Sequence, residues 1–143
     1  MTTTFDLFGD LRWFAVPVAT LAYFLLGAVW FTPLFGKAWD DAIGHRRVAG
    51  DRFSAAYYVV PLLSSLLVTV TMAALLARSG TEGLVDALAL AVVVGLGVAL
   101  AISVTNALTP HTPHPFRLGL ITGGYHLIGI VVVTLLLALM TST

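Results

Sequence analysis

The placement of charged residues constrains the fold of this chain more than any other feature of its sequence. Seven Lys and Arg and seven Asp and Glu are gathered so that four stretches contain no charged residue. The stretches cover residues 13–36, 53–77, 87–116 and 118–143 and hold 24, 25, 30 and 26 residues. A membrane-spanning helix needs about 20 predominantly apolar residues. Each stretch is therefore long enough to cross a bilayer.

The predicted fold class is all-α, an integral membrane bundle of four transmembrane helices that run up and down. We expect a single domain over residues 1–143, with spans at about 13–31, 57–77, 86–108 and 118–140. The connection 78–85 is short, which favours antiparallel neighbours. Residues 36–52 hold half of all charges and are predicted as a loop with one short helix at 37–43. Asp51 is the expected N-cap of the second long helix.

Composition excludes several classes of protein. Only 10% of the residues are charged, against about 25% in a soluble domain, so a water-soluble enzyme and a separate extramembrane domain are excluded. No basic run points to nucleic acid. Cysteine is absent, and no serine elbow, phosphate-binding glycine loop, HExxH helix or carboxylate pair occurs. We therefore expect no enzyme activity, no catalytic residue, no cofactor, no metal site and no nucleic-acid partner.

Lys and Arg are unevenly divided between the two sides of the predicted membrane. The N-terminal segment and the second loop supply Arg12 and Arg78. The first and third loops supply five cations, namely Lys37, Arg46, Arg47, Arg52 and Arg117. Since loops rich in Lys and Arg face the cytoplasm, both termini are predicted to lie outside a bacterial cytoplasmic membrane. The acidic N-terminus is unlike a secretory signal and is expected to be retained.

Four of these cations are candidates for contact with lipid headgroups, and the bilayer is an expected partner. A Lys or Arg just outside a span can extend its apolar stem along the membrane and place its charge among the headgroups. The candidates are Lys37, Arg46, Arg47 and Arg52. A role confined to setting the topology is the alternative.

Small residues recur at every fourth position of the third span, where they permit close helix packing. The row includes Gly95 and Ala99, and the fourth span carries Gly119 and Gly123 as a GxxxG pair. A four-residue step drifts around a straight α-helix by about 40°, so the third-span row is too long to face one neighbour. This indicates self-association into a homo-oligomer; the alternative is that Ala is simply common in such a composition.

His126 is the ionisable residue that the fourth predicted span places below the interface. At 1.5 Å per residue, it lies about 12 Å beyond Leu118 from the cytoplasmic side. Small and polar neighbours on the same helix face indicate that it faces protein rather than lipid. Two interpretations stay open: a functional residue that contacts a ligand, ion or proton, or a neutral imidazole whose hydrogen bond fixes helix packing.

Other polar side chains lie at comparable depths and are predicted to form a polar layer with His126. They are Tyr125, Ser103, Asn106, Trp30, Ser64 and Ser65, with Asn106 the shallower. The rotation of each helix about its axis decides whether they meet, and depth alone does not fix that rotation.

Two segments resemble a known family. LLGAVWFTPLFGKAW, residues 25–39, and GGYHLIGIVVV, residues 123–133, are similar to the small bacterial membrane-protein family catalogued as domain of unknown function 1761. The matching positions are Gly27, Trp30, Phe31, Pro33, Phe35, Gly36, Lys37, Trp39, Gly124, Tyr125 and His126. The resemblance implies a membrane protein of this length and implies no activity. The family often has Tyr where this chain has Phe31, so a hydroxyl there is not essential.

The functional expectation is a small transport or channel-like protein whose polar layer contacts a small solute, an ion or a lipid. The alternative is a non-catalytic scaffold or accessory subunit whose Gly and Ala faces bind another copy or a larger assembly. A membrane enzyme ranks third, because the sequence supplies no evident catalytic group.

Overall fold

The computed structural model describes residues 13–141, which hold helices and loops and no strand. The N-terminal segment, with Arg12, lies outside the described residues. The elements in chain order are α2 (Ala15–Val29), η1 (Trp30–Leu34), α3 (Gly36–Ile43), α4 (Ala56–Ser79), α5 (Leu84–Val94), η2 (Gly95–Leu100), α6 (Ala101–Ala107) and α7 (Pro115–Thr141). Four helical stretches are long and apolar enough to cross a membrane: Ala15–Leu34, Ala56–Ser79, Leu84–Ala107 and Pro115–Thr141. The all-α fold class with four membrane spans is confirmed.

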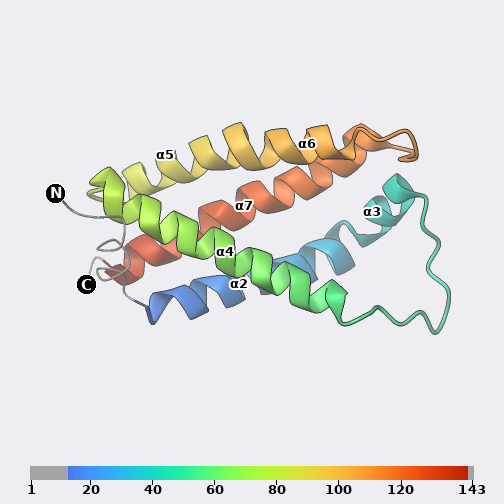
Figure 1. Cartoon of the computed structure of the whole chain (residues 1–143), viewed down its shortest axis with the longest axis horizontal. Coiled ribbons are helices and arrows are strands. Elements are labelled where there is room, and N and C mark those ends of the chain that lie inside the picture. Colours follow the sequence, from blue (N-terminus) through green and yellow to red (C-terminus); the bar gives the residue numbers. More distant parts are fainter. Residues whose placement is uncertain (1–12, 142–143) are drawn as a thin grey trace.

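The last helix is the centre of the arrangement. Helix α7 packs against α2, α4 and the third span, while α2 and α4 also pack on each other. The third span, made of α5, η2 and α6, makes its extensive contacts with other spans on α7 alone, and Figure 1 shows it running along one side of that helix. The bundle is thus a compact trio of α2, α4 and α7 with the third span on the outer side of α7.

The small-residue row of the third span faces α7, not several neighbours. Ala87, Ala91, Gly95 and Ala107 are buried there. The expectation that the row is too long for one neighbour is wrong, and η2 gives the reason. Within η2 the chain is π-helical, so each turn holds more residues than an α-turn. In an α-helix four residues advance slightly more than one full turn, whereas in a π-helical turn they advance slightly less than one. The two deviations have opposite signs, so the drift of the row around the span is partly cancelled.

Glycines on α7 permit this close packing. A side chain built at Gly119 would place its Cβ 2.7 Å from the Cα of Val104 on α6. One at Gly123 would overlap Leu100, and one at Gly95 on the third span would overlap Leu127. Ala99 is half-buried beside this interface. Close backbone approach is the way apolar helices gain packing contacts in a bilayer.

The loops that connect the spans gather at the two ends of the bundle. In Figure 1 the connection from α3 to α4 and that from α6 to α7 lie at one end, opposite the α4–α5 turn. Gly44 and Gly80 end α3 and α4 with φ angles of 70° and 62°, a conformation that favours glycine. The prediction that Asp51 caps α4 is wrong: α4 begins after Ala55 without a side-chain cap, and Asp51 accepts a hydrogen bond from the Val48 amide.

The first span ends in a π-helical turn whose cause is a proline. Pro33 has no N–H and its ring would crowd the carbonyl one α-turn earlier. The chain responds by widening, so that the Phe35 amide donates to the Trp30 carbonyl at 2.8 Å. The short helix α3 then turns to run beside the start of α7. Widened turns of this kind are frequent at functional sites.

Candidate functional site

The two segments that carry the family resemblance meet where α2 packs on α7. The ring of Tyr125 on α7 lies over Gly27 on α2, where an added Cβ would sit 3.0 Å from the phenol oxygen. The indole of Trp30 lies near Gly124 and donates from Nε1 to the Ile121 carbonyl at 3.0 Å. Gly27 and Trp30 of the first motif therefore contact Tyr125 and Gly124 of the second, and these positions of the shared pattern form one helix–helix interface.

Aromatic rings fill the space around that interface. The Tyr125 ring centroid lies 5.2 Å from that of Tyr23 and 5.1 Å from that of Phe31. The Tyr125 hydroxyl donates to the Tyr23 carbonyl at 3.4 Å. Ser65 on α4 is buried as well. Tyr125 is thus buried in the core, with 6% of its surface exposed.

His126 is held by a residue of the first span that sequence reasoning missed. The Tyr23 hydroxyl lies 2.6 Å from His126 Nδ1, and Tyr23 is 1% exposed. Its ring fits over Gly129, where a larger residue would overlap it. A polar aromatic residue in the middle of the first span and a glycine one turn beyond His126 were the available signals, but no sequence rule pairs them.

The direction of this hydrogen bond fixes the protonation of the imidazole. A buried phenol that does not donate leaves a costly unpaired O–H. Among the described residues His126 Nδ1 is the acceptor within reach of the Tyr23 hydroxyl. We therefore assign the neutral tautomer with its proton on Nε2. The Nε2 atom has no described hydrogen-bond partner and is not sealed in the core.

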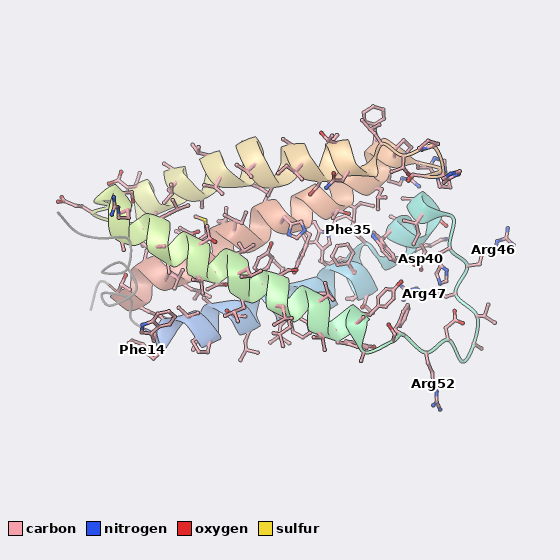
Figure 2. All side chains as sticks on the ribbon, viewed as in Figure 1. Phe14, Phe35, Asp40, Arg46, Arg47 and Arg52 are labelled. Atoms are coloured by element: carbon pink, nitrogen blue, oxygen red, sulfur yellow. The ribbon has the colours of Figure 1, made fainter. Side chains whose placement is uncertain are left out.

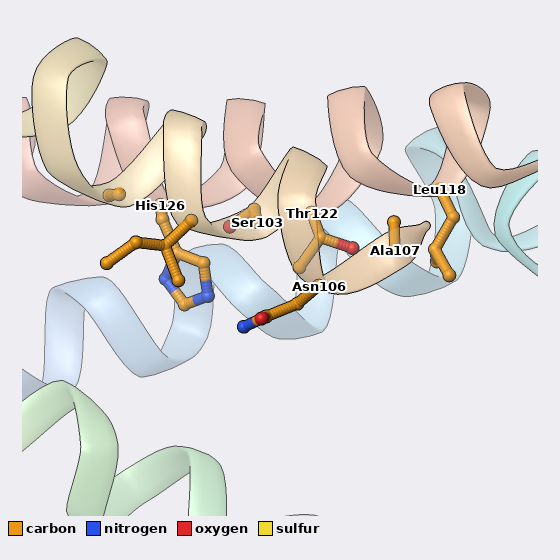
Figure 3. A pocket seen from close by; sticks show the side chains of 8 residues that line it. Ser103, Asn106, Ala107, Leu118, Thr122 and His126 are labelled. Atoms are coloured by element: carbon orange, nitrogen blue, oxygen red, sulfur yellow. The ribbon is translucent and has the colours of Figure 1, made fainter. Parts of the chain in front are cut away.

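A groove opens between α6 and the first half of α7, on the side of His126 away from Tyr125. Its volume is about 430 Å³. The lining residues are Ala99, Ile102, Ser103, Asn106, Ala107, Leu118, Thr122 and His126. Figure 3 shows the His126 ring and the Asn106 amide pointing into the same space from opposite helices. Ile102 and Asn106 are exposed, so the groove is open on its flank.

The predicted polar layer is divided into two parts by α7. Ser103 and Asn106 lie in the groove with His126, whereas Tyr125, Trp30 and Ser65 lie in the packed core. Ser64 joins neither part, because it is exposed on the outer face of α4. His126 alone of the predicted set touches both environments, bonded to Tyr23 on one edge and facing the groove on the other.

The four headgroup candidates have different surroundings. Arg46 and Arg52 project away from the helices in Figure 2, and Lys37 is exposed on α3. Arg47 instead joins the first loop to the bundle: its Nε lies 2.5 Å from Asp40 Oδ2, and its Nη2 donates to the Phe31 carbonyl at 3.4 Å. Arg47 thus serves an internal contact at the π-helical turn in addition to any contact with lipid.

Among the described residues, no group of three or more His, Cys, Asp or Glu could hold a metal ion. The polar atoms at the groove are an imidazole, an amide and two hydroxyls. This set can hydrogen-bond a ligand and can exchange a proton at one nitrogen. It contains no nucleophile paired with a base.

The fold and the groove together define a multi-pass helical membrane protein with a neutral polar site beside its central helix. The chain belongs to the family described as Protein of unknown function (DUF1761), whose sequence profile matches residues 14–138. The family expected from residues 25–39 and 123–133 is thereby confirmed. No curated protein and no solved structure matches the chain.

Proposed function

We propose that the protein is a small transport or channel-like membrane protein whose substrate contacts His126 in the groove between α6 and α7. The observation that carries the proposal is the two-sided environment of the imidazole: Nδ1 is fixed by Tyr23, and Nε2 is left for a ligand. A polar atom without a partner inside a bilayer is costly. A bound substrate would remove that cost.

The extent of the groove supports a binding site more than a continuous pore. The lining of α7 runs from Leu118 to His126, about 12 Å along the helix at 1.5 Å per residue. The hydrocarbon core is about 30 Å thick, so the groove reaches from one end to the middle. Transfer across the membrane would require a second arrangement of the helices that opens His126 to the other side.

Binding is tested by thermal unfolding of the purified protein in lipid nanodiscs against a panel of ligands. The panel contains inorganic ions, water-soluble metabolites, phospholipids and neutral membrane-soluble compounds. We expect at least one class to raise the midpoint of unfolding of the wild type and to leave that of His126→Phe unchanged. The matched control is Ser64→Ala, which removes a polar group from an outer face. The proposal is contradicted if every ligand class in the panel changes the midpoint of unfolding equally in the wild type and in His126→Phe.

The scaffold interpretation is the second candidate, and one observation favours it. Only 17% of the most apolar window of the third span is buried, the lowest share of the four spans. A partner helix would find a large uncovered face there. The His126→Ala variant distinguishes the two candidate functions. If this variant keeps flux and ligand binding but no longer assembles with a partner, the scaffold function is supported and transport is not.

A further inference from the structure

We infer that the ligand of the groove is a neutral, membrane-soluble molecule whose carbonyl oxygen accepts hydrogen bonds from His126 Nε2 and the Asn106 amide. This inference rests on the proposed function and names the substrate class of the same site. It follows from four properties of the groove: its charge, its hydrogen-bond donors, its depth and the side on which it opens.

The groove has no charge with which to bind an ion. Its eight lining residues are apolar or neutral, and His126 is neutral in the tautomer that Tyr23 imposes. A bare ion moved from water into a site of low dielectric constant loses hydration worth many kcal/mol. Opposite charges or a ring of carbonyls would have to replace that hydration, and the lining supplies neither. A neutral ligand has no such requirement.

The polar groups of the groove are arranged to donate. In the tautomer assigned above, His126 Nδ1 accepts from the Tyr23 hydroxyl and Nε2 carries the proton. The Asn106 amide offers two N–H groups. In Figure 3 the two side chains approach one space from α7 and α6. A carbonyl oxygen has two lone pairs and can accept from both. The lining is otherwise dominated by apolar atoms of residues such as Ile102 and Leu118, which suit a hydrocarbon body.

Depth separates this ligand from an ordinary phospholipid. His126 follows Leu118, where the uncharged stretch of α7 begins, by eight residues, which places it about 12 Å into the apolar part of the helix. That position is near the middle of a hydrocarbon core about 30 Å thick. A phospholipid keeps its headgroup in water, so its ester carbonyls stay near the edge of the core. A carbonyl at the depth of His126 belongs to a molecule that lies within the core, as an isoprenoid quinone or a long-chain ketone does.

The groove opens sideways, and such a molecule would enter from the bilayer. Ile102 is 54% exposed and forms part of the lining. The helix that carries it has its extensive contacts with other spans on α7 alone. No described helix closes the flank between Ile102 and solvent or lipid. In a membrane this flank faces hydrocarbon.

The experiment measures binding of a radiolabelled decyl-substituted 1,4-benzoquinone to the full-length protein in nanodiscs, with empty nanodiscs subtracted. The dimethyl ether of the corresponding hydroquinone is the matched probe that lacks the carbonyls. We expect saturable binding of the quinone, binding of the ether at least about tenfold weaker, and a Kd raised about tenfold in Asn106→Leu, as loss of one hydrogen bond produces. Ser64→Ala, on an outer face at similar depth, should bind like the wild type.

Asn106 is exposed, so its replacement is expected to leave folding intact. His126→Phe is measured in the same assay and should weaken quinone binding at least as much as Asn106→Leu does. The inference is overturned if quinone and ether bind equally, or if Asn106→Leu and His126→Phe both bind like the wild type. It is also overturned if an ion or a water-soluble metabolite binds in a His126-dependent manner while the quinone does not, and the proposed function then survives. If no class in the panel depends on His126, both fail.

Discussion

At the scale of single residues, the contact between Tyr23 and His126 determines what the membrane interior of this protein can do. In the assigned tautomer the phenol donates to Nδ1 of the imidazole, and the protonated Nε2 is left at the groove. Tyr23 is itself positioned by Gly129, because any side chain there would occupy the space of its ring. One small residue and one hydroxyl thus set the orientation of the polar group at the centre of the site.

Replacing Tyr23 by Phe removes the hydroxyl and leaves His126 Nδ1 without a partner. We expect the free energy of unfolding in detergent or bicelles to fall by about 0.5–1.5 kcal/mol. Reversible unfolding by a denaturing detergent measures the change. Tyr57→Phe is the matched control because Tyr57 is 58% exposed and should change stability little. Equal losses in the two variants would show that the hydroxyl of Tyr23 contributes nothing specific.

Replacing Gly129 by Ala tests the packing that positions Tyr23. The added methyl would overlap the Tyr23 ring, so α2 and α7 must separate or the ring must rotate, at a cost of about 1–3 kcal/mol. Gly97→Ala places the same methyl in open space and is expected to be neutral or stabilising, since Ala favours helix over Gly. The same unfolding assay compares them. A Gly129→Ala protein as stable as the wild type would be inconsistent with this packing.

Sequence reasoning reached His126 but not its partner, for a physical reason. A polar residue in a long apolar span is conspicuous, and its depth follows from helical rise. The rotation of each helix is set by packing against its neighbours, which a single sequence does not display. Hence the structure brings Ser103 and Asn106 to one groove with His126, whereas Trp30 and Ser65 lie on the other side of α7.

At the scale of elements, the two π-helical turns adjust the spans to α7. In η1, Pro33 widens the turn, and the Arg47 guanidinium donates a hydrogen bond to the Phe31 carbonyl. In η2, the wider turn keeps the small residues of the third span facing one helix. Proline predicts the first widening from sequence. The second occurs within Gly95–Leu100, where Ala, Gly, Leu and Val give no such signal.

Replacing Asp40 by Asn tests how α3 is fastened to the end of the first span. Asp40 is 8% exposed and pairs with Arg47, so the neutral side chain should loosen α3 from the bundle. Hydrogen exchange of the amides of α3 is expected to become several-fold faster, because local opening becomes easier. Asp41→Asn is the control, since Asp41 is exposed. Unchanged exchange in Asp40→Asn would mean that the ion pair does not hold α3.

At the scale of the whole molecule, the positions of the charged residues predict the number of spans. They do not predict the arrangement of the spans, because that depends on contacts between helices. Four uncharged stretches become four spans because each is long enough for a bilayer. A four-helix bundle with one shared core would enclose a polar layer. This chain instead places α7 at the centre and the third span on its outer side, which divides the polar residues and leaves the groove open.

The orientation of the bundle is predicted by the distribution of Lys and Arg and is tested with single cysteines, since the chain has none of its own. His45→Cys lies in the first loop and Thr81→Cys in the second. A membrane-impermeant maleimide is expected to label the first only from the cytoplasmic face and the second only from outside. Labelling of His45→Cys from outside would reverse the orientation.

The central claim is that Tyr23 fixes His126 so that a protonated Nε2 faces a ligand-binding groove. Nitrogen-15 NMR of the histidine ring in lipid bilayers tests it most directly, with His45, His111 and His114 replaced by Gln to leave one signal. We predict a neutral imidazole with an unprotonated Nδ1 and a protonated Nε2, and a shift of the Nε2 resonance when the decyl-substituted benzoquinone is added. A protonated Nδ1, or an Nε2 resonance that no class of ligand moves, would contradict the claim.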